Sequence, residues 1–266
     1  MRRPFHKMHG LGNDFVIVDA RDGPFEVTPA LAKAIANRRT GVGCDQFILL
    51  EPSTTADLRM RIWNSDGSEV ESCGNATRCV VQLTGAKRIE TDGGLLEGQA
   101  LDGEVEVTLP EPRFDWQDIP LSYAMDTNAL PLAWDSLEQP MAINVGNPHV
   151  VFFVPDAREV PLDMLGPRIE HDPAFPERIN VNVATALDNI LKLRTFERGA
   201  GQTAACGTGA CATAVAAIAT KRAASPVHVD MKGGSLIIAW APGEPIRMRG
   251  TATHVYSGEL DLDALR

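Results

Sequence analysis

The chain of 266 residues repeats itself once, at an interval close to half its length. Gly12-Asn13 recurs as Gly146-Asn147. Cys73-Gly74 recurs as Cys206-Gly207, at an interval only one position shorter. Because the matches keep one order and nearly one spacing, they predict two similar halves of about 130 residues each. Pockets lie preferentially where such units meet, so we expect the halves to face one another across a cleft.

Two further features recur in the same way. Gln46 is followed by Asn180 at the same interval as that between Asn13 and Asn147. A polar residue that follows an aromatic one, in Trp63-Asn64 and in Phe196-Glu197, stands nine positions before the repeated cysteine of each half. A single short match is usually only a turn, but several matches in one order indicate duplication of a whole fold.

Each half has the pattern of short strands around one principal helix. After Cys73, apolar residues recur at helical spacing through 76–83, and Gly85 is suited to end that helix. The run 209–220 is mostly Ala, Val, Ile and Thr, as expected of a helix that is buried on every side. Apolar and β-branched segments bounded by turn residues predict strands at 15–18, 47–50, 59–63, 105–109, 150–154, 191–196 and 236–240.

The segment 110–120 contains several prolines and reads as the crossover between the halves. We therefore place the N-terminal domain, which carries Cys73, at residues 1–118 and expect the last residues, about 260–266, to complete it. The C-terminal domain, which carries Cys206, then spans residues 119–259.

Composition and charge argue against several classes of protein. The 25 basic and 35 acidic residues give a net charge of −10, which is unfavourable for binding nucleic acid or an anionic membrane. No apolar stretch is long enough to span a membrane, and no apolar segment follows Arg2-Arg3 as it would in a signal peptide. We expect a cytoplasmic protein with no nucleic-acid or membrane partner.

Five cysteines stand at positions 44, 73, 79, 206 and 211. An odd number in a reducing compartment argues against a disulfide framework, and no Cys-x-x-Cys pair suggests a zinc site, so we expect no metal. Cys79 and Cys211 fall on apolar helix faces and are interpreted as core residues, and Cys44 lies in a turn as a bystander.

Cys73 and Cys206 each stand immediately before a predicted helix. The partial positive charge of a helix N-terminus lowers the pKa of a nearby thiol, and its free N–H groups hold a carboxylate. Gly74-Asn75 and Gly207-Thr208 supply those N–H groups. If both helix ends grip one carboxylate, the substrate's α-carbon lies between two sulfurs. One thiolate then removes the α-proton while the opposite thiol donates another, and the configuration inverts.

These residues are also compatible with two other classes of protein. A hydrolase with one cysteine nucleophile and a histidine is compatible with the six histidines, but it does not explain why the cysteine site occurs twice. A binding protein with a carboxylate clamp between its halves explains the repeat without catalysis. Replacing each cysteine by serine separates binding from turnover. No lysine stands in a constellation typical of a pyridoxal phosphate Schiff base.

The residues around both cysteines resemble the diaminopimelate epimerase family, and the likeness runs nearly end to end. The matching segments are Met8–Phe15, Asn64–Glu69, Cys73–Cys79, Gly146–His149, Phe175–Asn180, Glu197–Gly201 and Ala205–Cys211.

The resemblance implies an α+β fold of two pseudo-symmetric domains, each a curled, mostly antiparallel sheet wrapped around a central helix. It implies interconversion of LL- and meso-diaminopimelate on the route to lysine and peptidoglycan, without metal or coenzyme, by a homodimer. Cys73 and Cys206 would be the acid/base pair, and Gly74, Asn75, Gly207 and Thr208 would cradle the reacting carboxylate. The substrate, chiefly its far end, would be bound by Asn13, Gln46, Asn64, Asn147, Asn180, Glu197 and Arg198.

Some positions depart from the family's pattern. Ala76 stands where many relatives have Gly, Gln202 where many have Glu, Thr208 where Ser is common, and Ser65 where Ala is usual. Gln202 removes a charge near the second cysteine, which bears on the pKa of that thiol. The alternative is a proline racemase-like enzyme, in which the first cysteine is typically followed by Gly-His, whereas this chain has Gly74-Asn75. His149 is interpreted as either an assisting or a structural residue.

Overall fold

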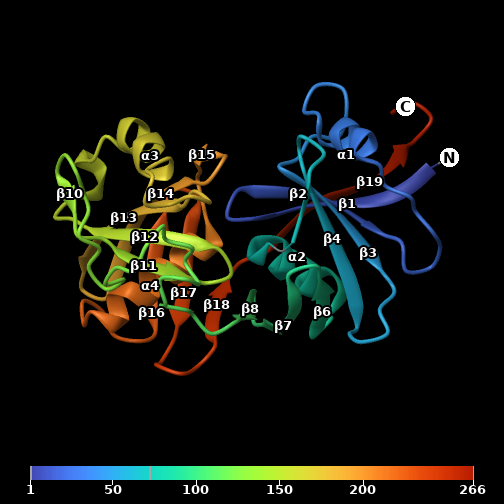
Figure 1. Ribbon diagram of the computed structural model, residues 1–266. Coiled ribbons are helices and arrows are strands. Elements are labelled where there is room, and N and C mark those ends of the chain that lie inside the picture. The colour runs from blue at the N-terminus through green and yellow to red at the C-terminus, as the bar shows by residue number, and fades with distance from the viewer. Residues whose placement is uncertain (1, 72, 266) are drawn as a thin grey trace. The chain divides into compact units, whose positions relative to one another are not determined.

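A computed structural model describes residues 2–71 and 73–265 (Figure 1). The chain forms two compact units, Met1–Val107 with Gly250–Arg266, and Thr108–Arg249. The chain passes between the units within strand β8 (Glu104–Leu109) and at the end of strand β18 (Ile246–Gly250). The domain boundaries predicted after residues 118 and 259 lie slightly further along the chain than these crossings.

The first unit is built of one sheet with helices α1 and α2 against it. In chain order its elements are β1 (Arg2–Gly10), β2 (Asn13–Asp19), α1 (Pro29–Ala36), β3 (Gln46–Glu51), β4 (Leu58–Asn64), β5 (Glu69–Val70), α2 (Gly74–Thr84), β6 (Arg88–Thr91), β7 (Gly94–Leu101) and β19 (Thr253–Asp261). β1 pairs antiparallel with both β19 and β2. β2 then pairs parallel with β3, and β4 pairs antiparallel with β3 and parallel with β6. Helix α2 contacts β1, β7 and β19, and helix α1 contacts β3 and β4.

The second unit has the same kind of sheet. Its elements are β9 (Ala133–Trp134), β10 (Leu137–Glu138), β11 (Met141–Asn144), β12 (Pro148–Phe153), the 3₁₀ helix η1 (Ala157–Glu159), α3 (Leu162–Glu170), β13 (Asn180–Leu187), β14 (Ile190–Glu197), β15 (Gly201–Gln202), α4 (Gly207–Ala219), β16 (Val227–Met231), β17 (Gly234–Ala239) and β18. β12 pairs parallel with β13, β13 antiparallel with β14, and β14 parallel with β16. Helix α4 contacts β11, β12, β13, β14, β16 and β17, so the sheet wraps around it.

Equivalent strands of the two units pair in the same register. Phe15 pairs with Gln46 in the first unit, and His149 pairs with Asn180 in the second, so both partners are displaced along the chain by the same repeat interval. Each sheet is mostly antiparallel and has parallel pairs at corresponding places. The predicted fold of two pseudo-symmetric α+β halves, each a sheet around a central helix, is confirmed.

The two central helices differ in their surroundings. The Gly85 that ends α2 adopts a left-handed conformation (φ 72°), as predicted, because glycine has no Cβ to disfavour it. Helix α4 is buried along most of its length, including Ala210, Ala212, Ala214 and Val215, and small side chains let the surrounding strands approach it closely. None of the helices in the described residues is long and apolar enough to cross a membrane.

Candidate active site

Both predicted catalytic cysteines occupy the N-cap position of a central helix. Cys73 precedes α2 with φ −150° and ψ 112°, and Cys206 precedes α4 with φ −124° and ψ 109°. The backbone is therefore extended at each cysteine and turns helical at the glycine that follows it. The first N–H groups of a helix have no partner within the helix, so those of Gly74, Asn75, Gly207 and Thr208 are suited to bind an anionic group beside the sulfur.

Three predicted residues of the first unit form one cluster. The Cys73 Sγ donates to Asn13 Oδ1 over 3.9 Å, and Asn75 Nδ2 donates to the same oxygen over 3.2 Å. Asn13 lies at the start of β2, next to a turn in which Leu11 (φ 56°) and Gly12 (φ 86°) are both left-handed. This turn brings Asn13 to the N-terminus of α2, beside a half-buried thiol.

Charged residues that were not predicted from the sequence hydrogen-bond to this cluster and hold it in place. Arg78 is fully buried and its Nη2 donates to Asn75 Oδ1 over 2.8 Å. Asp45 Oδ2 accepts from Asn13 Nδ2 over 3.1 Å, and Arg38 Nη2 donates to Asp45 Oδ1 over 2.7 Å. Arg78 lies five positions after Cys73, but only the fold reveals its contact with Asn75.

Asp14 completes this support. Burial opposes the charged form of Asp14, yet hydrogen bonds from Arg38 and Lys7 outweigh it and hold the pKa of the carboxyl below its usual value. The backbone N–H of Asp45 also donates to Asp14 Oδ1, over 3.0 Å. The base of the Asn13 turn is thus an ionic network, which fixes the amide that contacts Cys73.

Gln46 and Asn64 form a separate pair on neighbouring strands. Gln46 Nε2 donates to Asn64 Oδ1 over 3.0 Å, and Asn64 Nδ2 donates to Ser68 Oγ over 3.2 Å. Gln46 Oε1 is buried, and none of the described residues hydrogen-bonds to it. Because an unsatisfied buried acceptor is costly, this oxygen is suited to receive a donor from a bound molecule.

Cys206 differs from Cys73 in being buried, with 4% of its surface exposed. Burial raises the pKa of the Cys206 thiol well above its ordinary value, and the negative charge of Glu197 adds to this effect. The Thr208 hydroxyl, 3.6 Å from Sγ, and the Gly209 N–H, 3.4 Å from it, stabilise the thiolate but do not outweigh burial. The lowering of the pKa that the helix N-terminus predicts is therefore not the net result at Cys206.

Three other predicted residues meet around the turn between β14 and β15. Glu197 ends β14 and accepts a short hydrogen bond from the Thr203 hydroxyl. Asn180 Oδ1 accepts from the Arg198 backbone N–H over 3.0 Å, and Arg198 Nη1 donates to the Glu177 carbonyl over 3.0 Å. The Arg198 side chain is exposed, so a ligand can reach its guanidinium.

His149 has a structural role in the second unit. Its Nε2 lies 2.8 Å from Asn147 Oδ1, and its Nδ1 accepts from Asn182 Nδ2 over 3.0 Å. Asn182 Oδ1 in turn accepts from the Thr195 hydroxyl over 3.0 Å. Burial, with a contribution from the Arg198 charge, lowers the pKa of His149 to about 3, so the ring is neutral. Both ring nitrogens are engaged, which leaves neither to activate Cys206 as a hydrolase would require.

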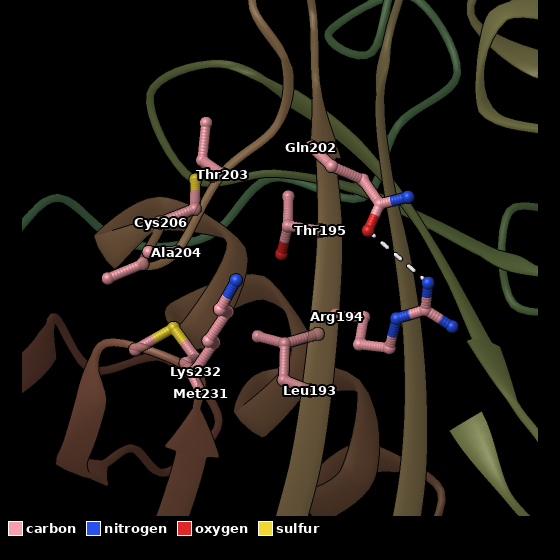
Figure 2. Close-up of a pocket in the computed structure, with 10 residues that line it drawn as sticks. Leu193, Arg194, Thr195, Gln202, Thr203, Ala204, Cys206, Met231 and Lys232 are labelled. Atoms are coloured by element: carbon pink, nitrogen blue, oxygen red, sulfur yellow. Dashed lines mark hydrogen bonds between the residues drawn. The ribbon is translucent and has the colours of Figure 1, made fainter. Parts of the chain in front are cut away.

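A cavity of about 170 Å³ in the second unit opens beside Cys206. Figure 2 shows the side chains of Thr195 and Lys232 pointing toward it, with Gln202 at the other side. Gln202 Oε1 accepts from Arg194 Nη2 over 3.2 Å, so the amide that departs from the family pattern still pairs with a cation. Thr195 and Lys232 were not predicted as site residues. Thr195 lies in β14 and Lys232 in the turn before β17, and only the folded chain places these two elements next to Cys206.

The remaining cysteines lie in the cores. Cys44, Cys79 and Cys211 are buried, and burial raises the pKa of Cys44 and of Cys79 to about 12. Among the described residues, no group of three or more His, Cys, Asp or Glu is placed to hold a metal ion.

The chain is similar over its whole length to proteins of one family. The sequence pattern of the family described as diaminopimelate epimerase matches residues 5–113 and 141–255, which include every predicted site residue. The chain is 66% identical to the diaminopimelate epimerase of Rhizorhabdus wittichii over 267 residues, covering 99% of this chain and 97% of the relative. It is 64% identical to that of Sphingopyxis alaskensis over 260 residues, covering 97% of each.

The fold is also found in solved structures of more distant sequence. A phenazine biosynthesis protein of the PhzF family from Enterococcus faecalis superposes with a TM-score of 0.73 at 13% identity, covering 98% of this chain and 99% of that one. This likeness concerns the fold alone. The matching segments and the high identity over nearly the full length establish that this chain belongs to the diaminopimelate epimerase family.

Proposed function

We propose that the protein interconverts LL- and meso-2,6-diaminopimelate, with Cys73 and Cys206 as the two proton-transfer groups and without a metal or coenzyme. The single observation that carries the proposal is the duplicated cysteine. Both sulfurs stand at the N-cap of the central helix of equivalent units, in the same extended backbone conformation. Family membership identifies the enzyme as an epimerase of the isomerase class.

The proposed reaction needs only the two thiols and the substrate. One cysteine, as thiolate, takes the α-proton, and the electron pair of the broken C–H bond spreads onto the substrate carboxylate. The other cysteine, as thiol, delivers its proton to the opposite face of the α-carbon. The first sulfur ends protonated and the second ends as thiolate, so the enzyme is ready for the reverse reaction.

The helix ends are suited to stabilise the charge that develops. The backbone N–H groups of Gly74 and Asn75, and those of Gly207 and Thr208, lie in the first turns of α2 and α4. Donors that are already in place before reaction stabilise the extra negative charge on the carboxylate at no cost of reorganisation. Burial keeps Cys206 in its thiol form, so we assign it the role of proton donor when Cys73 is the base.

The far end of the substrate carries a second carboxylate and a second ammonium group. We propose that the exposed guanidinium of Arg198 pairs with the carboxylate, since a guanidinium binds carboxylates in a two-pronged geometry. Glu197 and the side-chain oxygens of Asn64, Asn147 and Asn180 are candidates to receive the ammonium. The buried Gln46 Oε1 is a further acceptor of the same kind.

We also propose that the enzyme works as a homodimer in the cytoplasm, on the route to lysine and peptidoglycan. Family resemblance supports this proposal. Strand β19 exposes Val255 (53%) and Tyr256 (45%), apolar side chains that a second copy of the chain could cover. Light scattering on the purified protein tests the proposed dimer, and a monomer at micromolar concentration contradicts it.

The central experiment replaces each cysteine in turn. Cys73→Ala and Cys206→Ala are each expected to lower kcat for diaminopimelate by about 10²-fold or more, because each removes one proton-transfer group, while the circular dichroism spectrum is unchanged. Cys211→Ala is the matched control, since Cys211 is a buried thiol of α4, and its kcat should stay within a few-fold of wild type. Near-normal turnover in either of the first two variants refutes the pairing.

The same assay decides between substrates. LL-diaminopimelate, meso-diaminopimelate and L-proline are offered to the wild-type enzyme at equal concentration, and the optical rotation of each solution is followed. Inversion of diaminopimelate alone is expected. Inversion of proline alone supports the racemase alternative instead.

A further inference from the structure

Glu170, the last residue of α3, is an acid that the proposed mechanism does not use. Its surface is only 3% exposed, although a carboxylate is rarely buried unless it has partners. Its Oε1 accepts a hydrogen bond of 2.8 Å from the backbone N–H of Gly199. Gly199 directly follows Glu197 and Arg198, the two residues assigned to the far end of the substrate.

The turn that contains Gly199 needs an external partner to hold one conformation. Gly199 (φ 76°) and Gly201 (φ 81°) both adopt left-handed backbone conformations, which glycine enters at low cost but also leaves easily. Within the turn, the Ala200 N–H donates to the Glu197 carbonyl over 3.1 Å. From outside it, Asn180 Oδ1 holds the Arg198 N–H and Glu170 Oε1 holds the Gly199 N–H. Two consecutive N–H groups are thus anchored by two side chains.

For the conformation of this turn, the hydrogen bond that Glu170 Oε1 accepts matters more than the negative charge of Glu170. Arg178 Nη1 lies 3.9 Å from Oε1 and His171 Nδ1 lies 3.7 Å from Oε2, but the side chains of Arg178 and His171 are each 54% exposed. An ion pair between Glu170 and an exposed cation contributes little to stability, and water can solvate the cation if the pair is broken. The Gly199 N–H, by contrast, is held in a fixed direction by the buried oxygen.

We infer that Glu170 is a positioning residue for substrate recognition: its Oε1 fixes the turn that directs Glu197 and Arg198 toward the far end of diaminopimelate. The inference rests on the proposed function, because it takes those two residues as the distal binding groups. Losing the anchor weakens ground-state binding and transition-state binding alike, so KM rises while kcat is kept.

The test compares three variants at Glu170 with a control on the same helix. Glu170→Gln keeps an oxygen at the same reach, and its KM is expected within about 2-fold of wild type. Glu170→Asp keeps the charge but is one methylene shorter, and Glu170→Ala has no acceptor. Both should raise KM about 3- to 10-fold, with kcat within about 2-fold, as the loss of one hydrogen bond predicts. Asp163→Asn, an exposed acid in the first turn of α3, should leave both constants unchanged.

The outcomes separate this inference from the proposed function. If wild-type enzyme does not epimerise diaminopimelate, the proposed function fails. If wild type is active but Glu170→Asp and Glu170→Ala keep its KM, the inference fails alone. A KM for Glu170→Gln as high as that of Glu170→Ala overturns the role of the oxygen in favour of the charge. If Glu170→Ala does not fold, the Gln and Asp variants still decide the question.

Discussion

At the scale of single residues, the two cysteines lie in different environments. Cys206 is buried beside the carboxylate of Glu197, and both features favour its neutral thiol. Cys73 is half-buried beside the Asn13 amide, whose position is fixed by Asp45. The two sulfurs therefore occupy equivalent positions in the fold but are not equivalent chemically.

The neutral His149 predicts how stability depends on pH. Its pKa in the folded protein, about 3, lies below the ordinary value of 6.5, so below pH 6.5 the unfolded chain binds a proton that the folded chain does not. Stability is fully present above pH 6.5 and is lost as pH falls toward 3, by about 1.4 kcal/mol for each pH unit.

The variant His149→Gln is expected to remove this contribution. Its free energy of unfolding, measured with urea, should fall by about 2 kcal/mol less than that of wild type between about pH 7 and about pH 5. An equal fall in both proteins contradicts a neutral, buried His149.

At the scale of elements, the repeated helices provide their own control. Gly209 in α4 corresponds to Ala76 in α2, since each stands three positions after the cysteine of its half. A Cβ at Gly209 would lie 2.6 Å from Asn182 Oδ1 and 3.0 Å from Thr195 Oγ1, whereas α2 accommodates the methyl group of Ala76. The second half therefore requires glycine where the first does not.

Gly209→Ala is expected to destabilise the protein by about 1–3 kcal/mol, because Asn182 and Thr195 must move. It should also lower kcat, since the Gly209 N–H donates to the Cys206 sulfur. The control Ala76→Gly should cost about 0.5–1 kcal/mol through helix propensity alone. Thermal unfolding and initial rates measure both effects, and equal losses in the two variants argue against the steric explanation.

Much of the secondary structure follows from local pattern. The predicted strands 47–50 and 59–63 are β3 and β4 to within a residue, because their apolar runs are bounded by polar turns. The helices after both cysteines were also predicted, and so was the end of α2 at Gly85. The second helices α1 and α3 were missed, although Thr28-Pro29 is an N-cap signal for α1 and the internal Pro167 obscures α3.

The supporting contacts of the site were less predictable. Asn13, Cys73 and Asn75 could be named from motifs, and the structure brings them together. Asp45, Arg78 and Glu170 could not, because their contacts depend on strand register and helix packing between residues distant in the chain.

At the scale of the whole molecule, the two units share a backbone arrangement around each cysteine but support it with different side chains. In the first unit, the residues behind Asn13 form an ionic network that includes Asp14 and Arg38. In the second unit, Asn147, which the repeat relates to Asn13, instead contacts His149 in a neutral network with Asn182 and Thr195. The repeat has kept the backbone that presents each cysteine while the supporting chemistry has diverged.

The proposed pairing of the cysteines predicts a specific oxidation product. Treatment with diamide should join Cys73 to Cys206 and abolish activity, because the proposed pairing requires both thiols to reach one small substrate. Dithiothreitol should restore the activity. Cys44 and Cys79 should remain reduced, because the proposed mechanism places neither of these core thiols opposite another thiol across the substrate. Peptide mapping by mass spectrometry checks this, and loss of activity with no linked 73–206 peptide is evidence against the pairing.

The most direct measurement of proton transfer by two opposed groups is the isotope content of the first product formed in deuterated water. LL-diaminopimelate is converted for a small fraction of one equilibration, and the meso product is examined by NMR and mass spectrometry. The two-cysteine account predicts solvent deuterium at the inverted α-carbon, because the sulfur that donates has exchanged with solvent. Retention of the original hydrogen at that carbon contradicts it.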